Sequence, residues 1–126
     1  SAVAEFCGGL NCEPQKVLMG GPMMGMTVYD FDSPVIKNNN AVLFFDEKQS
    51  KEKKTTACIR CGRCIDNCPV HLMPAAIERA YMAKEDARLR ELKVSLCMEC
   101  GCCAYVCPAK RHLVVYNQLG KQMIKK

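Results

Sequence analysis

Two blocks of cysteines are the residues of this chain whose types and spacing could do chemistry. Residues 58–69 read CIRCGRCIDNCP, and residues 97–108 read CMECGCCAYVCP. Aligned at an offset of 39 residues, the blocks share four cysteines, a glycine and a closing proline. Both have the spacing C-x2-C-x2-C-x3-C-P, which is typical of the loops that bind [4Fe-4S] clusters. The pattern therefore predicts thiolates that hold iron and sulfide.

The spacing also predicts how the thiols are shared. Three thiolates placed two residues apart can surround one face of a cubane, and the fourth corner must be filled from elsewhere in the chain. In two-cluster proteins of this type the fourth cysteine of each run serves the other cluster. We therefore predict two [4Fe-4S] clusters with crossed ligands. Cluster I takes Cys58, Cys61, Cys64 and Cys107, and cluster II takes Cys97, Cys100, Cys103 and Cys68.

Cys102 stands beside Cys103, so either thiol could be the third ligand of the second block. The spacing favours Cys103, because its distance to Cys107 in the sequence equals that of Cys64 to Cys68. Cys102 is then predicted not to be a ligand.

Glycine and proline at matched places predict the backbone of both loops. Gly62 and Gly101 lie between the second and third cysteines, where a residue without Cβ can take positive φ and let the chain approach a cluster. Pro69 and Pro108 follow the last cysteines and suit the first position of a helix. We expect each loop to lead directly into a helix.

Two other uses of the cysteines compete with iron–sulfur ligation. The chain has 11 cysteines, and a disulfide framework would fit such a density in a small secreted protein. The odd count, the paired blocks and the lack of a signal peptide favour a reducing compartment instead. Structural zinc is consistent with the number of thiols, but the repeated triple spacing and trailing proline favour iron–sulfur. Cys7 and Cys12 lie far from both blocks and are interpreted as small buried hydrophobes or idle thiols.

Length and charge narrow the class of protein. The 126 residues are 49% hydrophobic, enough for one modest domain or two small ones. The longest apolar run, residues 41–45, is too short to cross a bilayer. The formal charge of +5 falls to about +1 when eight thiolates and two oxidised cores are counted, which argues against nucleic-acid binding. Residues 1–9 read as the end of an apolar helix, and we expect the chain to be a fragment of a longer polypeptide.

The elements that must position the cysteines divide into three regions. Residues 1–45 carry short apolar, β-prone runs, KVLMGG and NAVLFFD, bounded by turn residues. Residues 46–56 are polar and mostly charged, so they are predicted to form an exposed linker. Residues 57–126 form the cluster domain, and the fold class is α+β.

Two helices are predicted around the second cysteine block. Residues 74–92 are rich in Ala, Glu, Arg and Leu, with Asp86 as the candidate break, and residues 112–124 have one apolar face. The 28 residues between Cys68 and Cys97 favour helices over the short hairpins of compact ferredoxins. The cluster domain is thus predicted to be mainly helical.

Other motifs are interpreted as structural. The stretch GGPMMG at residues 20–25 matches neither dinucleotide-binding nor Walker patterns, so it is predicted to be a tight turn after a strand. Met23, Met24 and Met26 are expected to pack rather than bind metal, and the single histidines His71 and His112 are not expected to be ligands. No nucleophile and base are arranged for bond-making catalysis, so the catalytic set is empty.

Taken together, EFCGG, VLMGGPMMGM, SPVIKNNNAVLFF and CIRCGRC resemble the C subunit family of Rnf-type ion-translocating ferredoxin:NAD oxidoreductases. The resemblance implies that residues 1–45 are part of a β-grasp-like region and that residues 57–126 form a domain of the α-helical ferredoxin type. It places the FMN and NAD sites only in a preceding part that is missing here. A cobalamin reductase of propanediol-utilising compartments has a similar arrangement and stays open as an alternative.

The function predicted from the residues and the resemblance is electron transfer. Two clusters would pass single electrons between a flavin or nicotinamide site and another carrier, in a complex held peripherally at the cytoplasmic face of the cell membrane. The implied partners are the other subunits and a redox carrier such as ferredoxin, without nucleic acid and without a membrane span of this chain. The competing function is a zinc-stabilised interaction module without redox activity.

Overall fold

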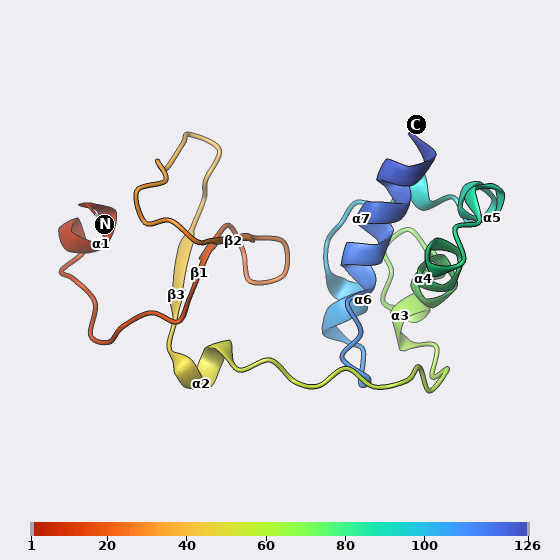
Figure 1. Cartoon of the computed structure of the whole chain (residues 1–126), viewed down its shortest axis with the longest axis horizontal. Helices are drawn as coiled ribbons and strands as arrows, with labels where there is room; N and C mark the ends of the chain where they lie inside the picture. Colours follow the sequence, from red (N-terminus) through yellow and green to blue (C-terminus); the bar gives the residue numbers. More distant parts are fainter. Residues whose placement is uncertain (1, 126) are drawn as a thin grey trace. The chain divides into compact units, whose positions relative to one another are not determined.

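The computed structural model describes residues 2–125, and the chain divides into two compact units, residues 1–52 and residues 53–126. Unit 1 combines a small sheet with two short helices, and unit 2 is helical (Figure 1). The elements of unit 1 are α1 (Ala2–Phe6), β1 (Lys16–Met19), β2 (Met26–Val28), β3 (Val42–Phe45) and α2 (Glu47–Ser50). Those of unit 2 are α3 (Arg63–Asp66), α4 (Pro74–Met82), α5 (Asp86–Glu91), the 3-10 helix η1 (Val94–Leu96), α6 (Cys102–Tyr105) and α7 (Leu113–Ile124).

The sheet of unit 1 has three antiparallel strands in the order β2-β1-β3. Val17 of the central strand faces Val28 on one side and Phe44 on the other. Val17 and Leu18 are the buried hydrophobic side chains described in this unit, because apolar β-branched and aromatic residues pair across the central strand. The two predicted apolar runs do form strands, whereas β2 was not expected from its sequence.

The turn between β1 and β2 confirms the structural interpretation of the glycine-rich stretch. The N–H of Gly25 donates to the carbonyl of Gly21 at 2.7 Å. A Cβ on Gly25 would lie 2.6 Å from that same oxygen and 2.8 Å from the carbonyl oxygen of Met19. Only glycine therefore fits where the chain folds back on itself.

The expectation that the three methionines of this turn pack inside the protein is wrong. Met23, Met24 and Met26 are 37%, 62% and 76% exposed. The strand β2, which begins at Met26, lies at an edge of the sheet, and the buried apolar core described in this unit is limited to Val17 and Leu18, so it offers these side chains little to pack against.

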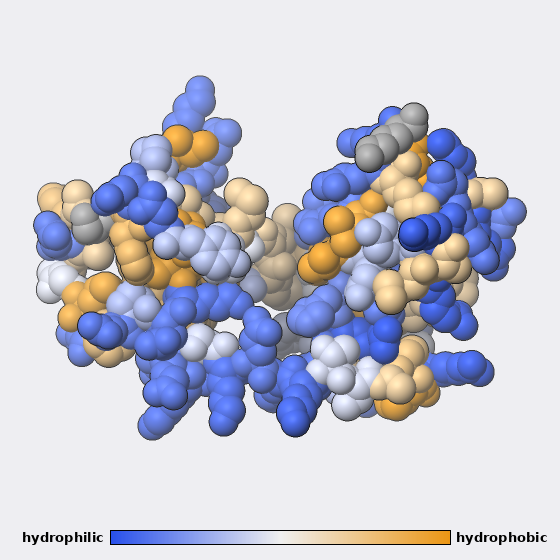
Figure 2. Space-filling model, in the orientation of Figure 1, coloured by the Kyte–Doolittle hydropathy of each residue, from blue (hydrophilic) through white to orange (hydrophobic). Residues whose placement is uncertain are grey.

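The expected linker contains one ordered helical turn. Asp46 caps α2, since its carboxylate accepts the N–H of Gln49 at 2.7 Å. The surface around α2 and the segment that follows it is hydrophilic in Figure 2, as the charged sequence of residues 46–56 requires.

In unit 2, the predicted helix over residues 74–92 is broken, as expected near Asp86. Helix α4 ends at Met82, and Lys84 adopts a left-handed conformation with φ of 57° before α5 starts at Asp86. A non-glycine residue in this region interrupts helical geometry and redirects the chain. The helix predicted over residues 112–124 is present as α7.

Helices α4, α5 and α7 pack around a small apolar core (Figure 1). Gly120 of α7 faces α5 and η1, because a Cβ there would lie 3.4 Å from side-chain atoms of Leu89 and Val94. Three cysteines, Cys68, Cys103 and Cys107, are themselves part of the buried core.

The repeat read in the cysteine blocks continues into the helices. The same offset of 39 residues carries α3 onto α6 and the first residue of α4, Pro74, onto the first residue of α7, Leu113. Little sequence identity accompanies the second match, so the blocks alone did not reveal it.

The prediction that Pro69 and Pro108 begin helices is wrong. Both lie in turns, in which the N–H of His71 donates to the carbonyl of Cys68 and the N–H of Lys110 donates to that of Cys107. His71 and Lys110 have φ of 51° and 52°, and left-handed residues end a helical path.

Within residues 2–125, none of the helices is both long and apolar enough to cross a membrane.

Candidate iron–sulfur centre

The two cysteine loops share one backbone conformation. Arg60 and Glu99 occupy equivalent places and have φ of 55° and 59°, while Gly62 and Gly101 have φ of 79° and 81°. The prediction of positive φ at both glycines is confirmed. Left-handed residues alternating with ordinary ones turn backbone N–H groups inward, and such concavities recur at iron–sulfur sites.

The first cavity, which we call cavity I, lies between the first cysteine loop, α4 and the segment before α7. It has a volume of about 400 Å³. Its apolar walls include Ile65, Met73 and Leu113, and its polar rim includes Glu78 and Arg111. The cysteines that line it are Cys58, Cys61, Cys64 and Cys107. These are the four thiols that the spacing assigns to cluster I.

A second and narrower cavity, cavity II, has a volume of about 10 Å³. It is bounded by Pro69, Val70, Met98, Val114 and Asn117. The cysteines that line it are Cys68, Cys97, Cys100 and Cys103. Each cavity therefore receives three thiols from one block and the fourth from the other block.

The two thiol sets differ in exposure. In the set at cavity I, Cys58 and Cys61 are exposed and Cys107 is buried, whereas in the set at cavity II Cys68 and Cys103 are buried and none is exposed. No three His, Cys, Asp or Glu side chains within the described residues converge as ligands of a single metal ion. In a cubane each thiolate binds a different iron, so a four-iron body needs thiols spread around its volume rather than gathered at one point. The eight cysteines divide between the two cavities, four lining each.

Burial and neighbouring thiols act on two of these cysteines. Burial raises the pKa of the Cys64 thiol, with smaller contributions from Cys107 and Cys58. Burial also raises the pKa of Cys103 to about 12, and Cys97 and Cys100 add to this effect. Thiols gathered in a low-dielectric site resist ionisation until a cation is bound, so they fit metal ligation better than open reactivity.

Two hydrogen bonds reach cysteine sulfur atoms at cavity II. The backbone N–H of Leu72 donates to Sγ of Cys68 at 3.3 Å. The side-chain Nδ2 of Asn117 donates to Sγ of Cys97 at 3.4 Å. Donors of this kind orient ligand sulfurs and stabilise negative charge on them.

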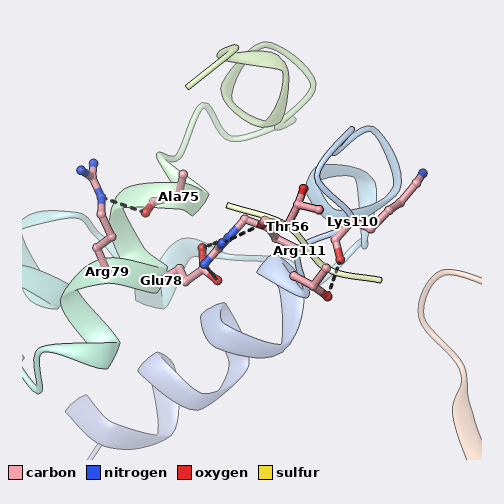
Figure 3. A network of polar contacts seen from close by, with 7 residues as sticks. Thr56, Ala75, Glu78, Arg79, Lys110 and Arg111 are labelled. Carbon is pink, nitrogen blue, oxygen red and sulfur yellow. Dashed lines mark hydrogen bonds and ion pairs between the residues drawn. The ribbon is translucent and has the colours of Figure 1, made fainter. Parts of the chain in front are cut away.

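A partly buried ion pair borders cavity I (Figure 3). Nε and Nη2 of Arg111 donate to the two carboxylate oxygens of Glu78, both at 2.7 Å. Nη1 of the same guanidinium donates to the carbonyl of Thr56 at 3.0 Å, and the N–H of Thr56 donates to the carbonyl of Ala109. The forked pair raises the pKa of Arg111 and fixes the chain entering the first loop against the chain leaving the second.

A more exposed ion pair supports the second loop. Nζ of Lys121 donates to the carboxylate of Glu99 at 2.5 Å and to the carbonyl of Cys97 at 3.0 Å. The Lys121 ammonium holds the pKa of Glu99 below its usual range. Helix α7 is thereby connected to the loop that carries Cys97 and Cys100.

The remaining cysteines lie outside the two sets. Cys102 is half-buried and does not line either cavity, and hydrogen bonding with Cys100 raises the pKa of its thiol. Cys7 and Cys12 are exposed, so the first of their two interpretations, the buried hydrophobe, is wrong, and the idle thiol stays a prediction. Neither lies in the unit that carries the two cavities.

Sequence reasoning missed Glu78 and Asn117, which are the buried polar residues of the described chain. A single Glu or Asn inside a helical pattern does not reveal its burial. The offset of 39 residues relates the two positions, but it does not indicate that either side chain is buried.

Comparison with known proteins gives one matching family and several relatives. Residues 57–110 match the family described as "4Fe-4S dicluster domain". The chain is 46% identical over 74 residues to the C subunit of the ion-translocating oxidoreductase complex of Rhodobacter capsulatus, covering 59% of this chain and 14% of that protein. It is 41% identical over 73 residues to the C subunit of the proton-translocating ferredoxin:NAD(+) oxidoreductase complex of Clostridium ljungdahlii, covering 58% and 16%.

A third relative is the C subunit of the Na(+)-translocating ferredoxin:NAD(+) oxidoreductase complex of Acetobacterium woodii, 42% identical over 76 residues, covering 60% of this chain and 17% of that protein. The chain thus spans less than a fifth of the length of these relatives. The resemblance drawn from the sequence is confirmed: residues 57–110 match a 4Fe-4S dicluster domain, and the iron–sulfur region of the chain is 41–46% identical to C subunits of ion-translocating oxidoreductase complexes.

Proposed function

We propose that unit 2 is an electron-transfer module that holds two [4Fe-4S] clusters with crossed ligands. Cluster I is held by Cys58, Cys61, Cys64 and Cys107, and cluster II by Cys97, Cys100, Cys103 and Cys68. The observation that carries the proposal is the separation of these eight thiols into two cavities, each lined by three cysteines of one block and the fourth of the other.

The chain's own residues bind and insulate the clusters. A bound [4Fe-4S] cluster supplies one-electron chemistry, accepting an electron from a reduced one-electron carrier and returning it to an oxidised one. The thiolates would hold the irons, left-handed loop residues would present N–H groups, and the apolar walls of cavity I would surround part of the cluster. No bond in the protein is made or broken in this transfer.

The wider setting is proposed from the relatives. We place this module in a membrane-associated ferredoxin:NAD oxidoreductase complex, with the other subunits and ferredoxin as partners, because two relatives carry that name. The proposed position is peripheral, at the cytoplasmic face of the membrane. FMN and NAD are assigned to the part of such subunits that this chain does not cover.

The domain limits are proposed on the same basis. Residues 1–45 would be a piece of a β-grasp-like domain, residues 46–56 a linker, and residues 57–126 an α-helical ferredoxin-type domain. The three-stranded sheet supports the first assignment, since it borders an apolar cavity of about 700 Å³ that includes Val17, Met19 and Phe44. A sheet face with so large an apolar hollow is typical of one layer of a larger domain.

Anaerobic reconstitution of the full chain with iron and sulfide tests the proposal. We expect about eight iron atoms per chain, four for each cluster, with broad absorption near about 400 nm and two spin-resonance signals after reduction. A colourless protein that binds zinc stoichiometrically would instead support the zinc-stabilised module.

Crossed ligation has its own test. Cys68→Ala removes a thiol from cluster II while all cysteines of cluster I remain, so the signal of cluster II should be lost or converted and that of cluster I retained. Cys7→Ala, at an exposed thiol of unit 1, is the control and should change neither signal. Loss of cluster I in Cys68→Ala would contradict the crossing.

A further inference from the structure

The two buried polar side chains of the described chain occupy matched positions. Glu78 on α4 is 3% exposed and Asn117 on α7 is 1% exposed. The offset of 39 residues that relates the cysteine blocks also relates these two positions. Glu78 lines cavity I, and Asn117 lines cavity II. The repeated architecture therefore places one buried polar group beside each proposed cluster, but the chemistry of the two groups differs.

Glu78 is fully engaged away from the thiols. Both of its carboxylate oxygens accept N–H groups of Arg111, so the pair is close to neutral and no hydrogen-bond donor of Glu78 faces a sulfur. Asn117 instead directs its amide Nδ2 to Sγ of Cys97. Its Oδ1 has no hydrogen-bond partner among the described residues.

A buried amide with an unpaired carbonyl destabilises the fold, because its oxygen has lost water without gaining a donor. An apolar side chain would avoid this cost within α7. The contact that Asn117 does make is with a predicted cluster ligand, so its effect should be sought on the cluster rather than on the stability of the helix.

We propose that Asn117 is a positioning residue that raises the reduction potential of cluster II, the one held by Cys97, Cys100, Cys103 and Cys68. The inference rests on the proposed function. Reduction adds one electron, and part of the added negative charge resides on the thiolate sulfurs. An N–H donor to sulfur stabilises that reduced state more than the oxidised state, which raises the potential.

Backbone N–H donors do not distinguish the two clusters as the side chain of Asn117 does. Backbone N–H groups reach sulfur in both sets, at Cys64 from Ala75 and at Cys68 from Leu72. The side-chain amide of Asn117 is the donor that has no counterpart at the matched position, where Glu78 is an acceptor. Substitution at residue 117 therefore isolates the proposed effect.

The test is a potentiometric titration of the reconstituted full chain, with dithionite as the reductant and spin resonance as the readout. Asn117→Leu keeps the branched shape and removes the donor. We expect the ratio of reduced to oxidised cluster II at a fixed potential to fall about tenfold, equivalent to about 59 mV for a one-electron couple. The midpoint of cluster I in the same sample should not move.

Three further variants make the result specific. Asn117→Asp keeps the size of the side chain and replaces the N–H donor with an acceptor, so the midpoint of cluster II should fall in this variant as well. It provides the test if Asn117→Leu does not fold. Gln122→Leu makes the same amide-to-leucine change at an exposed position of α7 and should leave both midpoints unchanged. Cys58→Ser changes a ligand of the other set and identifies the signal of cluster I.

The failures of the two proposals are distinguishable. A wild-type chain that does not assemble two clusters would overturn the proposed function, and the role of Asn117 with it. The role of Asn117 alone would be overturned if two clusters assemble and neither substitution at Asn117 changes their midpoints. It would also be overturned if the substitutions shift the signal of cluster I, which Cys58→Ser identifies.

Discussion

Cys102 and Cys103 are adjacent in the sequence, yet only Cys103 lines cavity II. We expect Cys102→Ser to retain both clusters at full occupancy, because the hydroxyl can replace the thiol in its contact with Cys100. Cys103→Ser should reduce occupancy of cluster II, since serine is a poor ligand for iron in place of a thiolate. Iron and sulfide content after reconstitution measures both. The opposite behaviour of the two variants would show that the register of the second block is wrong.

For individual residues, the sequence was most informative where cluster binding imposes a fixed spacing. The eight candidate thiols and the positive φ of Gly62 and Gly101 follow from the constraints of a cluster loop. Glu78 and Asn117 could not be predicted, because their burial depends on which helix face meets the cavities, and this is decided by packing among distant residues. The exposure of Cys7 and Cys12 likewise depends on the small size of the sheet core.

Among the elements, the ion pair between Arg111 and Glu78 joins the segment before α7 to α4. Arg111→Leu should destabilise the reconstituted protein by about 3–5 kcal/mol, because it leaves the buried carboxylate without its cation and breaks the contact with Thr56. Denaturant unfolding followed by far-UV circular dichroism measures the loss.

Arg88→Leu is the matched control for that change. Its pair with Glu91 lies at the surface, with side chains 56% and 63% exposed, so its removal should cost no more than about 1 kcal/mol. Equal losses in the two variants would mean that burial of the carboxylate is not what makes the Arg111 pair important.

The contact of α7 with α5 and η1 allows another prediction, at Gly120. A Cβ there meets Leu89 and Val94 at 3.4 Å, which is ordinary contact, so Gly120→Ala should stabilise the protein by up to about 1 kcal/mol through helix propensity. Gly120→Leu should destabilise it by about 1–3 kcal/mol by overpacking. Thermal unfolding of both variants tests how tightly α7 packs at this position. Equal stability of Gly120→Leu and Gly120→Ala would contradict the tight packing.

Elements with strong periodic or β-prone patterns were predictable. The helices over residues 74–92 and 112–124 and the strands near residues 16–19 and 42–45 follow from local sequence. The helix starts assigned to Pro69 and Pro108 were wrong because His71 and Lys110 adopt left-handed conformations. The residue types at these two positions do not predict such a conformation. Strand β2 exists through pairing with β1 rather than through its own composition.

For the whole molecule, we expect residues 58–124 to be poorly ordered without clusters and residues 1–45 to be indifferent to them. The thiols of Cys68, Cys103 and Cys107 are part of the core of unit 2, so ligand binding and core formation are one process. A domain of this size buries too little apolar surface to be stable by packing alone. Amide hydrogen exchange of the apo and reconstituted chain measures the difference, region by region. Equal protection of residues 58–124 in both forms would show that the helices pack without help.

The matching of α3 with α6 and of Pro74 with Leu113 has a consequence for ancestry and assembly. If each half gives its fourth thiol to the other, a peptide carrying a single half cannot complete either site, whereas two copies related by a rotation axis can complete both. Such an arrangement is an isologous homodimer, in which one surface patch faces its own equivalent. Unit 2 then corresponds to a dimer fused into one polypeptide. Such a fusion would assemble independently of protein concentration, and its halves could differ, as they do where the carboxylate of Glu78 matches the amide of Asn117.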